Sequence, residues 1–508
     1  MPSSTHDEEL RRLALSILQP GFVGTTAPDW VLRDIADGLG SVVLFSRNIA
    51  SPGQVARLVG QLRSENPDLI VAIDEEAGDV TRIEFATGST RPGNFALGAV
   101  DDAALTETVA ADLGHELRAT GITLDYAPSV DVNSNPDNPV IGVRSFGADP
   151  QLVSRHAAAW IRGLQSSGVA ACAKHFPGHG DVAVDSHHGL PTYGADRERI
   201  AAEALPPFRA ALDAGARAVM SAHLLVPAHD PAEPATLSRA LLHDLLRTDL
   251  GFEGMVVSDA IEMGAVSDRY GIDGAAVRAV AAGVDALCVG GENADEGTAR
   301  TIVTALVDAV VQGRLPAERL AQAADRVREF AAWSAELRRT SPAGPLSSGI
   351  GVEAARRAVR LTGSAPDALP LTAPPHVVEL APGTNLAVGS HTPWGVAAPL
   401  TERLPGTTSV RLQEQDLGSP DAVRTQALAP AAGRPLVVVV RDAARHGWLA
   451  RTLTGLLAER PDAIVVEMGL PDPSAPGAVH IATHGATAAS GIAAAELLTG
   501  ALHCLATT

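Results

Sequence analysis

The sequence is poor in aromatic residues, cysteines and long apolar runs, and each shortage excludes a class of protein. Aromatic residues make up 3% of the 508 positions, so we expect a core built mainly from alanine, valine and leucine. Three cysteines, an odd number, argue against a disulfide framework, and Cys172 and Cys288 lie in apolar runs where a thiol acts as a small hydrophobic group. No run of about 18 uncharged apolar residues could span a bilayer, and the N-terminus lacks the apolar region of a signal peptide. We therefore expect a soluble, cytoplasmic protein, with export by a route without a signal peptide left open.

Positive charge is also scarce. The 39 Lys and Arg residues are outnumbered by 59 Asp and Glu residues, which gives a formal net charge of -20. Because binding to phosphate groups needs clustered basic residues, we expect no nucleic-acid partner and no membrane partner. Hydrophobic residues make up 46% of the chain and charged residues 19%, which is typical of a globular protein. The length favours two domains, or a large barrel with an appendage.

The first part of the chain, residues 1–338, alternates short apolar runs with segments of helical period. The eight runs are 15–22, 41–45, 69–74, 122–131, 169–175, 217–223, 255–259 and 285–289. Eight strands, each followed by a crossover segment, predict an α/β fold, a closed (β/α)8 TIM-type barrel with its active site at the carboxyl ends of the strands. Polar residues support this, since Asp74, Asp131, Lys174, His175, His223 and Asp259 all fall where an apolar run ends. An open doubly wound sheet is the competing fold.

A smaller second domain is expected after a linker. Residues 339–351 are rich in Pro, Gly and Ser, which is typical of a domain boundary. Residues 352–508 then contain four strand candidates, at 385–388, 435–441, 463–468 and 479–483, with a helical segment at 445–459. The alternation predicts a C-terminal α/β sandwich domain of parallel strands, with a structural or dimerising role as the default, so a homodimer is one alternative.

The loop after the fifth run concentrates titratable side chains. It follows Lys174 and His175 and carries two acids and three histidines, which are Asp181, Asp185, His179, His187 and His188. A carboxylate at Asp185 beside the imidazole of His187 would fix the tautomer of the ring and make it a proton donor and acceptor near neutral pH. The same pair could also belong to an ordinary polar surface loop.

A metal site is the alternative use of this loop. His175, His179, His187 and His188 with Asp185 could ligate a hydrolase metal, and His223 would be a further ligand. However, the spacing fits no HExxH or CxxC pattern, and Lys174 beside His175 would oppose a bound cation. We therefore expect no metal and no cofactor.

Other candidate site residues also lie at strand ends. Asp259 ends the apolar run in GMVVSDAIEM, where an ionised carboxylate held by a sheet could attack an electrophilic carbon, although it could equally cap a following helix. Asp74, Arg82 and Arg144 could bind a polyhydroxylated ligand, because carboxylates accept hydrogen bonds from hydroxyl groups and guanidinium groups donate them. Each of the three could instead belong to a structural ion pair.

Together these stretches resemble glycoside hydrolase family 3, and within it the two-domain form of the β-N-acetylglucosaminidase branch. The most specific motifs are KHFPGHG at 174–180 and DSHxxxP at 185–191. Supporting motifs, in the expected order, are AIDEEAGDVTR at 72–82, APSVDVNSNPDNPVIGVRSFG at 127–147, VMSAH at 219–223 and LGFEGMVVSDAIEMGAV at 250–266. They span nearly the whole first domain, and the match of the second domain is weaker.

The resemblance implies a retaining, exo-acting hydrolase of terminal β-linked N-acetylglucosamine, with cell-wall fragments or chitooligosaccharides as substrates. It implies Asp259 as the nucleophile, His187 as the general acid/base and Asp185 as the residue that orients His187. The residues that it implies for holding the sugar are Asp74, Arg82, Arg144, Lys174 and His175. The chain departs from the family's common EGGRV pattern at Ala77 and Asp79, which leaves the leaving-group preference open.

Three rival functions stay open on the sequence. A phosphorylase would use the same residues with phosphate in place of water, and a broad β-glucosidase would differ in the sugar. A catalytically silent sugar-binding module is the alternative outside enzymes, and the presence of Asp259, Asp185 and His187 argues against it.

Overall fold

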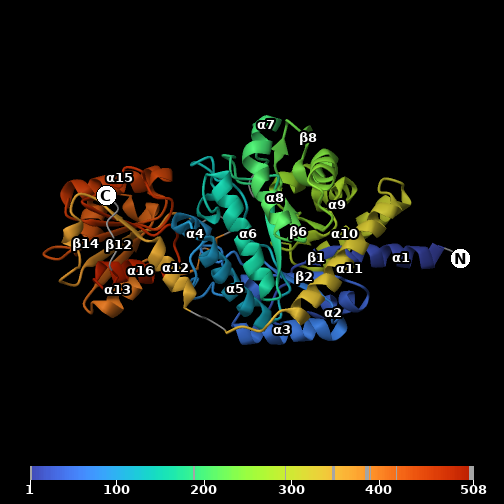
Figure 1. The fold of residues 1–508 in the computed structure, drawn as a ribbon, viewed down its shortest axis with the longest axis horizontal. Helices are drawn as coiled ribbons and strands as arrows, with labels where there is room; N and C mark the ends of the chain where they lie inside the picture. Colours follow the sequence, from blue (N-terminus) through green and yellow to red (C-terminus); the bar gives the residue numbers. More distant parts are fainter. Residues whose placement is uncertain are drawn as a thin grey trace. The chain divides into compact units, whose positions relative to one another are not determined.

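The structure is a computed structural model that describes residues 3–186, 189–291, 293–345, 349–383, 388–389, 391–418 and 420–502. The chain divides into two compact units, and Figure 1 labels several of their elements. Unit 1 consists of Met1–Glu76, Thr106–Ile141 and Gly147–Ser347, and unit 2 consists of Ala77–Leu105, Gly142–Phe146 and Ser348–Thr508. Among the residues described, no helix is both long and apolar enough to cross a membrane.

Unit 1 is built on eight strands, one in each of the eight predicted runs. Six form a parallel sheet in the order β2 (Ser41–Leu44), β3 (Ile70–Ile73), β4 (Leu124–Asp125), β5 (Ala170–Phe176), β6 (Ala218–Ser221) and β9 (Met255–Ser258). The other two, β1 (Leu18–Pro20) and β10 (Leu287–Val289), pair in parallel with each other. A parallel bridge joins Val257 of β9 to Ala286, the residue before β10, and the Ser41 hydroxyl of β2 donates to the Leu18 carbonyl of β1. The curled parallel sheet confirms the predicted (β/α)8 fold.

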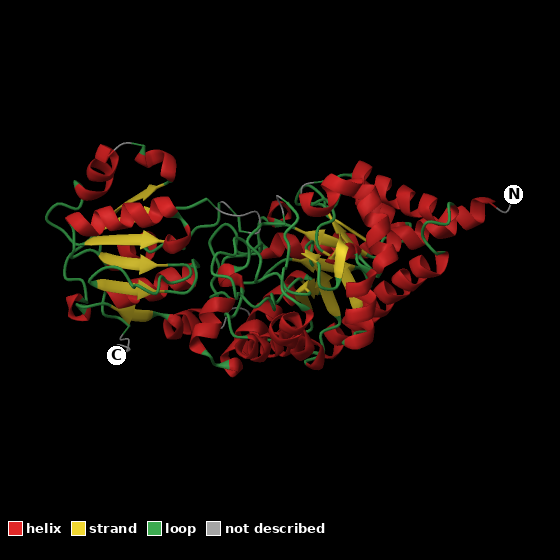
Figure 2. Ribbon diagram, turned by 90° about the horizontal axis from the view of Figure 1, so that it is seen from above, coloured by secondary structure: helices red, strands yellow, loops and turns green. Residues whose placement is uncertain are grey.

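Helices surround the strands of unit 1, as Figure 2 shows in red around the yellow strands. Every residue of β2, β3, β5, β6 and β9 is buried, as expected for a parallel sheet covered on both faces. The helices are α1 (Ser3–Ser16), α2 (Asp29–Ala36), α3 (Pro52–Glu65), α5 (Ala103–Thr120), α6 (Pro150–Ser166), α7 (Arg197–Arg199), α8 (Leu205–Asp213), α9 (Gly264–Ala282), α10 (Glu296–Val311) and α11 (Ala317–Thr340). Unit 1 also contains two π-helices (Ile200–Ala204 and Ala240–Asp249) and an antiparallel hairpin of β7 (Leu225–Val226) and β8 (Asp230–Pro234).

Unit 2 contains a six-stranded sheet in the order β11 (Arg360–Thr362), β16 (Val479–Ala482), β15 (Ile464–Glu467), β14 (Leu436–Val440), β12 (His376–Leu380) and β13 (Thr408–Leu412). All pairs are parallel except that of β11 with β16. Three of the four predicted strands are present as β14, β15 and β16. Residues 385–387 of the fourth lie outside the described part of the chain.

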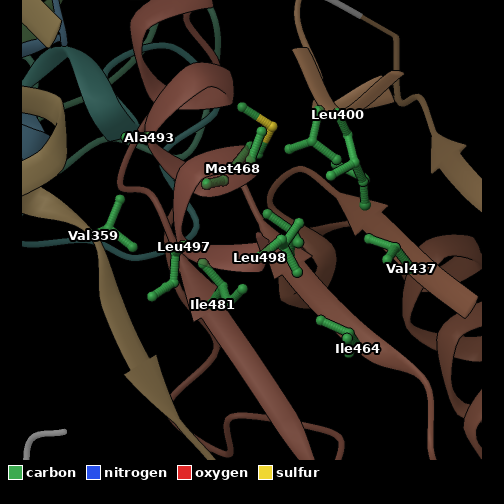
Figure 3. Packing of buried hydrophobic residues seen from close by; sticks show 14 of the residues in the cluster. Val359, Leu400, Val437, Ile464, Met468, Ile481, Ala493, Leu497 and Leu498 are labelled. Atoms are coloured by element: carbon green, nitrogen blue, oxygen red, sulfur yellow. The ribbon is translucent and has the colours of Figure 1, made fainter. Parts of the chain in front are cut away.

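Helices lie on both faces of this sheet, which confirms the predicted sandwich. Along β14, Val437 and Val439 pack in one apolar cluster, and Leu436, Val438 and Val440 pack in a second one. The first cluster, shown in Figure 3, includes residues of α12 (Ile350–Ala358), α13 (Ala397–Arg403) and α16 (Ala488–Leu498). The second includes residues of α15 (Gly447–Glu459) and of the π-helix Arg424–Leu428, which follows α14 (Pro420–Val423).

Two short segments from the first part of the chain belong to unit 2. They are Ala77–Leu105, which contains α4 (Asn94–Val100), and Gly142–Phe146. These two segments lie within the predicted first domain, residues 1–338, although they are grouped with the residues of the predicted second domain, 352–508. The domain limits therefore stay a prediction.

Candidate active site

Polar residues stand at the carboxyl ends of several barrel strands in unit 1. Asp74 follows β3, Lys174 and His175 lie in the last part of β5, and Asp259 follows β9. Because the strands of the barrel are parallel, their carboxyl ends meet at one mouth. Burial first of all, and then the negative charges of Asp74 and Asp259 among others, raise the pKa values of the buried Cys172 and Cys288 thiols. Both carboxylates therefore lie near the same two thiols.

Lys174 is the buried cation of this centre. Its side chain is 2% exposed, and its ammonium group donates to the Asp74 carboxylate and, over 2.5 Å, to Glu76 Oε1. The Glu76 side chain is 2% exposed and the Asp74 side chain 21%, so Asp74 is the more accessible of the two carboxylates. The sequence analysis did not single out Glu76 as a site residue. Its position two residues after Asp74 is the available signal, because residues two apart in an extended chain point to the same side.

His175 is oriented by a buried carboxylate. Asp131 is fully buried, and its Oδ2 accepts a hydrogen bond from His175 Nδ1 over 2.7 Å. Its Oδ1 accepts the backbone N–H of His179 over 2.7 Å, and the Ser129 hydroxyl donates to Oδ2 over 3.0 Å. Burial alone would raise the pKa of Asp131, but the charge and hydrogen bond of His175 hold it below its ordinary value. The His175 ring is thereby fixed with Nδ1–H toward Asp131.

His179 anchors the beginning of the loop after β5. Burial, with the nearby charge of His175, lowers the pKa of His179 to about 4, so the ring is neutral near neutral pH. Its carbonyl accepts a hydrogen bond from Asn138 Nδ2 over 2.7 Å, and its Nε2 lies 3.2 Å from the Ser186 hydroxyl. At Gly180, a Cβ would lie 1.8 Å from the Val132 carbonyl oxygen, so this close approach requires glycine.

Asp259 is held by backbone hydrogen bonds at the end of β9. Its N–H donates to the Ser221 carbonyl over 3.1 Å, and its Oδ1 accepts the Ala260 N–H over 2.8 Å. His223 donates from Nε2 to the Ala260 carbonyl over 3.0 Å, and its Nδ1 lies 2.8 Å from Thr236 Oγ1. His223 therefore fixes the turn that follows Asp259.

The alternative role of Asp259 as a helix cap is wrong. The next helix, α9, begins at Gly264, and its N-cap residue is Met263. The Asp259 side chain is partly exposed, with four residues between it and the first residue of the helix.

The rest of the loop is only partly described. Asp185 is described, and its carbonyl accepts the Gly189 N–H over 3.2 Å. His187 and His188 lie outside the described residues, so the pairing of Asp185 with His187 stays a prediction. Within the described ranges, no three His, Cys, Asp or Glu residues are arranged to hold a metal ion. This finding does not cover a metal site that would include His187 or His188.

Arg82 and Arg144 belong to unit 2, whereas Asp74, Lys174 and His175 belong to unit 1. Both are largely buried, at 8% and 7% exposure. Arg144 ends a 3₁₀-helix, Gly142–Arg144, and its carbonyl accepts a hydrogen bond from Asn94 Nδ2 over 2.7 Å.

These observations define a (β/α)8-barrel protein with a buried lysine, an oriented histidine and two carboxylates at the carboxyl ends of its strands, which is where barrel enzymes carry their catalytic residues. Residues 25–330 match the family model described as the glycosyl hydrolase family 3 N terminal domain. The chain belongs to glycosyl hydrolase family 3.

Relatives and solved structures agree with this membership. Beta-hexosaminidase A of Pseudoalteromonas piscicida is 35% identical over 317 residues, which are 58% of this chain and 53% of the relative. A beta-hexosaminidase of Mycobacterium tuberculosis is 41% identical over 223 residues, which are 43% of this chain and 57% of the relative. The chain thus matches little more than half the length of these curated relatives. A glycoside hydrolase family 3 beta-N-acetylglucosaminidase from Paenibacillus sp. str. FPU-7 is similar with a TM-score of 0.87 and 35% identity, over 97% of each chain.

Proposed function

We propose that the protein is a retaining β-N-acetylglucosaminidase that releases terminal β-linked N-acetylglucosamine. The observation that carries this proposal is the gathering of Asp74, Lys174, His175 and Asp259 at strand ends of a family 3 barrel. The names of the relatives, which are beta-hexosaminidases and a beta-N-acetylglucosaminidase, support the choice of sugar.

The proposed reaction has two steps. Asp259 attacks the anomeric carbon and forms a covalent glycosyl-enzyme, while His187 gives its proton to the departing oxygen. A water molecule then loses a proton to His187 and attacks the same carbon, which releases the sugar and restores the Asp259 carboxylate. Asp185 orients His187 in both steps. The role of His187 comes from the motif at 185–191.

The remaining site residues bind the sugar in this proposal. The Asp74 carboxylate accepts hydrogen bonds from hydroxyl groups, and Lys174 and His175 donate to sugar oxygens. Arg82 and Arg144 supply further donors. The hydrogen bond between His175 and Asp131 keeps the imidazole in one orientation, so little rotamer entropy is lost when the sugar binds.

The test is release of 4-nitrophenol from its β-N-acetylglucosaminide and from its β-glucoside, each with and without inorganic phosphate. We expect hydrolysis of the first compound, no requirement for phosphate, and a β-configured sugar as the first product seen by NMR. Phosphate-dependent release of a sugar 1-phosphate would indicate a phosphorylase instead, and preference for the glucoside would indicate a broad β-glucosidase.

A matched pair of variants links this activity to the site. Asp259→Ala should abolish turnover of the N-acetylglucosaminide, because it removes the nucleophile. Asp268→Asn, at an exposed position of α9, should leave turnover unchanged. Equal activity in the two variants would contradict the assignment of Asp259.

We also propose a cytoplasmic location and a cell-wall fragment or chitooligosaccharide as the substrate. The two cysteines within the described part of the chain, Cys172 and Cys288, are free thiols in buried positions, which fits a reducing compartment. A homodimer, and the lack of nucleic-acid and membrane partners, remain predictions from the sequence.

A further inference from the structure

Unit 1 contains a basic cavity of about 310 Å³ away from the residues of the proposed active site. It lies between the π-helix Ala240–Asp249, the end of α9 and the first turns of α11. A volume of this size is at the lower end of the range for small-molecule sites. The cavity has no Asp or Glu among its described lining residues, and its basic side chains are Arg239, His243, Arg247, Arg319 and Arg326.

The basic residues come from two helical faces. Arg239, His243 and Arg247 follow one another at intervals of four residues, from the N-cap of the π-helix into its last turn. Arg319 and Arg326 are two turns apart on α11, so they lie on the same side of that helix. The cluster is therefore made by the fold and not by a run of basic residues in the sequence.

A buried carboxylate, Asp285, holds three of the four arginines in place. Its Oδ2 accepts a hydrogen bond from Arg247 Nη2 over 2.5 Å and from the Val256 N–H over 2.9 Å. Its Oδ1 accepts from Arg319 Nη2 over 2.6 Å and from Arg326 Nη1 over 3.2 Å. The Asp285 side chain is fully buried, so this network also stabilises the amino ends of β9 and β10.

The arginines carry more positive charge than these acids neutralise. Among the described residues, the carboxylates within 4.0 Å of the four guanidinium groups are Asp285 and Asp244, which lies 3.7 Å from Arg239. Burial lowers the pKa of Arg247 to about 10, and although Asp285 opposes this shift, the charges of two neighbouring arginines, Arg326 first, add to it. Like charges held this close repel each other, so an anion between them is stabilising. The surplus is notable in a chain whose formal net charge is -20.

Several guanidinium donors remain available to such an anion. Arg326, with a side chain that is 22% exposed, uses Nη1 alone in hydrogen bonds to the described residues. Arg239 is 61% exposed and donates no hydrogen bond within the described ranges. The Arg247 side chain is 10% exposed, and its buried Nε–H has no acceptor in the part of the chain that the structure describes. Planar guanidinium groups match the oxygens of a phosphate group in charge and in geometry.

We propose that this cavity is a binding site for a phosphate group, carried by inorganic phosphate or by a small phosphomonoester. Arg239 and Arg326 contact the phosphate oxygens, and Asp285 keeps the remaining arginines in position behind them. The site lies at the amino ends of β9 and β10, whereas Asp259 follows the carboxyl end of β9. The inference therefore goes beyond the proposed hydrolysis and does not depend on it.

Titration calorimetry of the full-length protein with inorganic phosphate tests the site. At pH 8, with sodium chloride keeping the ionic strength constant, we expect one site per chain with a Kd of about 1 mM or lower. Arg326→Gln and Arg239→Gln should each raise Kd by roughly tenfold, because each removes a charge-assisted hydrogen bond. Arg328→Gln is the matched control. Arg328 lies on α11 with an exposed side chain that pairs with Asp325, so this variant should bind phosphate as wild type does.

Two results would overturn the proposal. One is the lack of saturable phosphate binding by wild type. The other is a Kd that is unchanged in both Arg326→Gln and Arg239→Gln, because the phosphate would then bind elsewhere. Arg239→Gln leaves the hydrogen bonds of Asp285 intact, so its Kd decides the question even if Arg326→Gln is less stable.

Thermal unfolding gives a second reading of the same site. Because a ligand that binds the folded state raises stability, phosphate should raise Tm of wild type more than chloride does at equal ionic strength. The rise should be smaller in Arg326→Gln and Arg239→Gln and unchanged in Arg328→Gln. An equal rise in all four proteins would contradict a site at these arginines.

Titration with glucose 6-phosphate and with glucose distinguishes the two sources of the phosphate group. A lower Kd for glucose 6-phosphate than for inorganic phosphate, with no binding of glucose, would support a phosphomonoester as the ligand. A higher Kd for glucose 6-phosphate would support inorganic phosphate. These titrations measure binding alone, so failure to release N-acetylglucosamine would overturn the proposed function and leave this site standing.

Discussion

Replacing Lys174 tests the electrostatic arrangement beneath the barrel mouth. Lys174 is the only lysine in the sequence, and its ammonium group, on a side chain that is 2% exposed, pairs with both Asp74 and Glu76. Lys174→Met removes the cation that these two carboxylates share. Breaking a buried ion pair costs about 3–5 kcal/mol, so we expect the free energy of unfolding to fall by that amount at pH 8.

The loss of stability in Lys174→Met should depend on pH. Without the ammonium group the carboxylates of Asp74 and Glu76 repel each other, and protonating one of them removes this repulsion, so the free energy of unfolding should fall less at pH 5 than at pH 8. Lys174→Arg keeps the charge but places a larger, planar group in a buried site shaped for a compact ammonium, so it should also destabilise the fold.

The measurement is thermal unfolding of wild type and variants across this pH range, followed by circular dichroism. Arg300→Met is the matched control, because Arg300 forms an exposed ion pair with Glu296, and such pairs contribute less than about 1 kcal/mol. A loss of stability in Lys174→Met that equals the loss in Arg300→Met, or that does not depend on pH, would show that Lys174 does not neutralise Asp74 and Glu76.

Three further predictions concern residues around the site. The pKa of His179 is lowered from 6.5 to about 4, so between these pH values the unfolded chain binds a proton that the folded protein does not, and the free energy of unfolding should fall by roughly 3 kcal/mol as the pH drops from 6.5 to 4. His179→Gln should therefore make Tm depend less on pH in this range, and an unchanged pH dependence would contradict the prediction. Gly180→Ala should cost about 1–3 kcal/mol through its clash with Val132, measured as a Tm decrease, while Gly194→Ala, at a position with open space, should cost little. His223→Phe should lower kcat about 10- to 100-fold with little change in KM, because it frees the turn after Asp259; a change in KM alone would speak against it.

Much of the barrel follows from the sequence because its strands are buried on both faces. Runs such as 69–74 and 255–259 are continuous apolar stretches that end in a polar residue, and a parallel barrel turns that pattern directly into strand ends at one mouth. Asp74, Lys174, His175 and Asp259 could therefore be placed on strand ends from the order of residues alone.

The second unit was harder to predict because two of its strands do not look like buried strands. β12 contains the charged residue Glu379, which pairs with Arg411 of β13 over 2.6 Å. β13 lies at the edge of the sheet, where Thr408 and Ser409 are exposed. Alternating or polar edge strands carry a weaker apolar signal than central ones.

Long-range pairs could not be predicted from local patterns. Asp79 and Arg441 are 362 residues apart in sequence, and Asp131 reaches His175 across 44 residues. The sequence shows Asp79 as a departure from the family pattern, but its counterion becomes visible only when the sandwich is folded around it.

The proposed reaction requires Asp259 to form a covalent bond to the anomeric carbon of N-acetylglucosamine. The direct test is mass spectrometry of the protein after reaction with an activated N-acetylglucosaminide whose ring fluorine slows release of the glycosyl-enzyme. We predict one added sugar, located by fragmentation on Asp259, and no adduct in Asp259→Ala. A sugar attached at another residue, or turnover of the reagent with inversion and no adduct, would show that Asp259 is not the nucleophile of a retaining reaction.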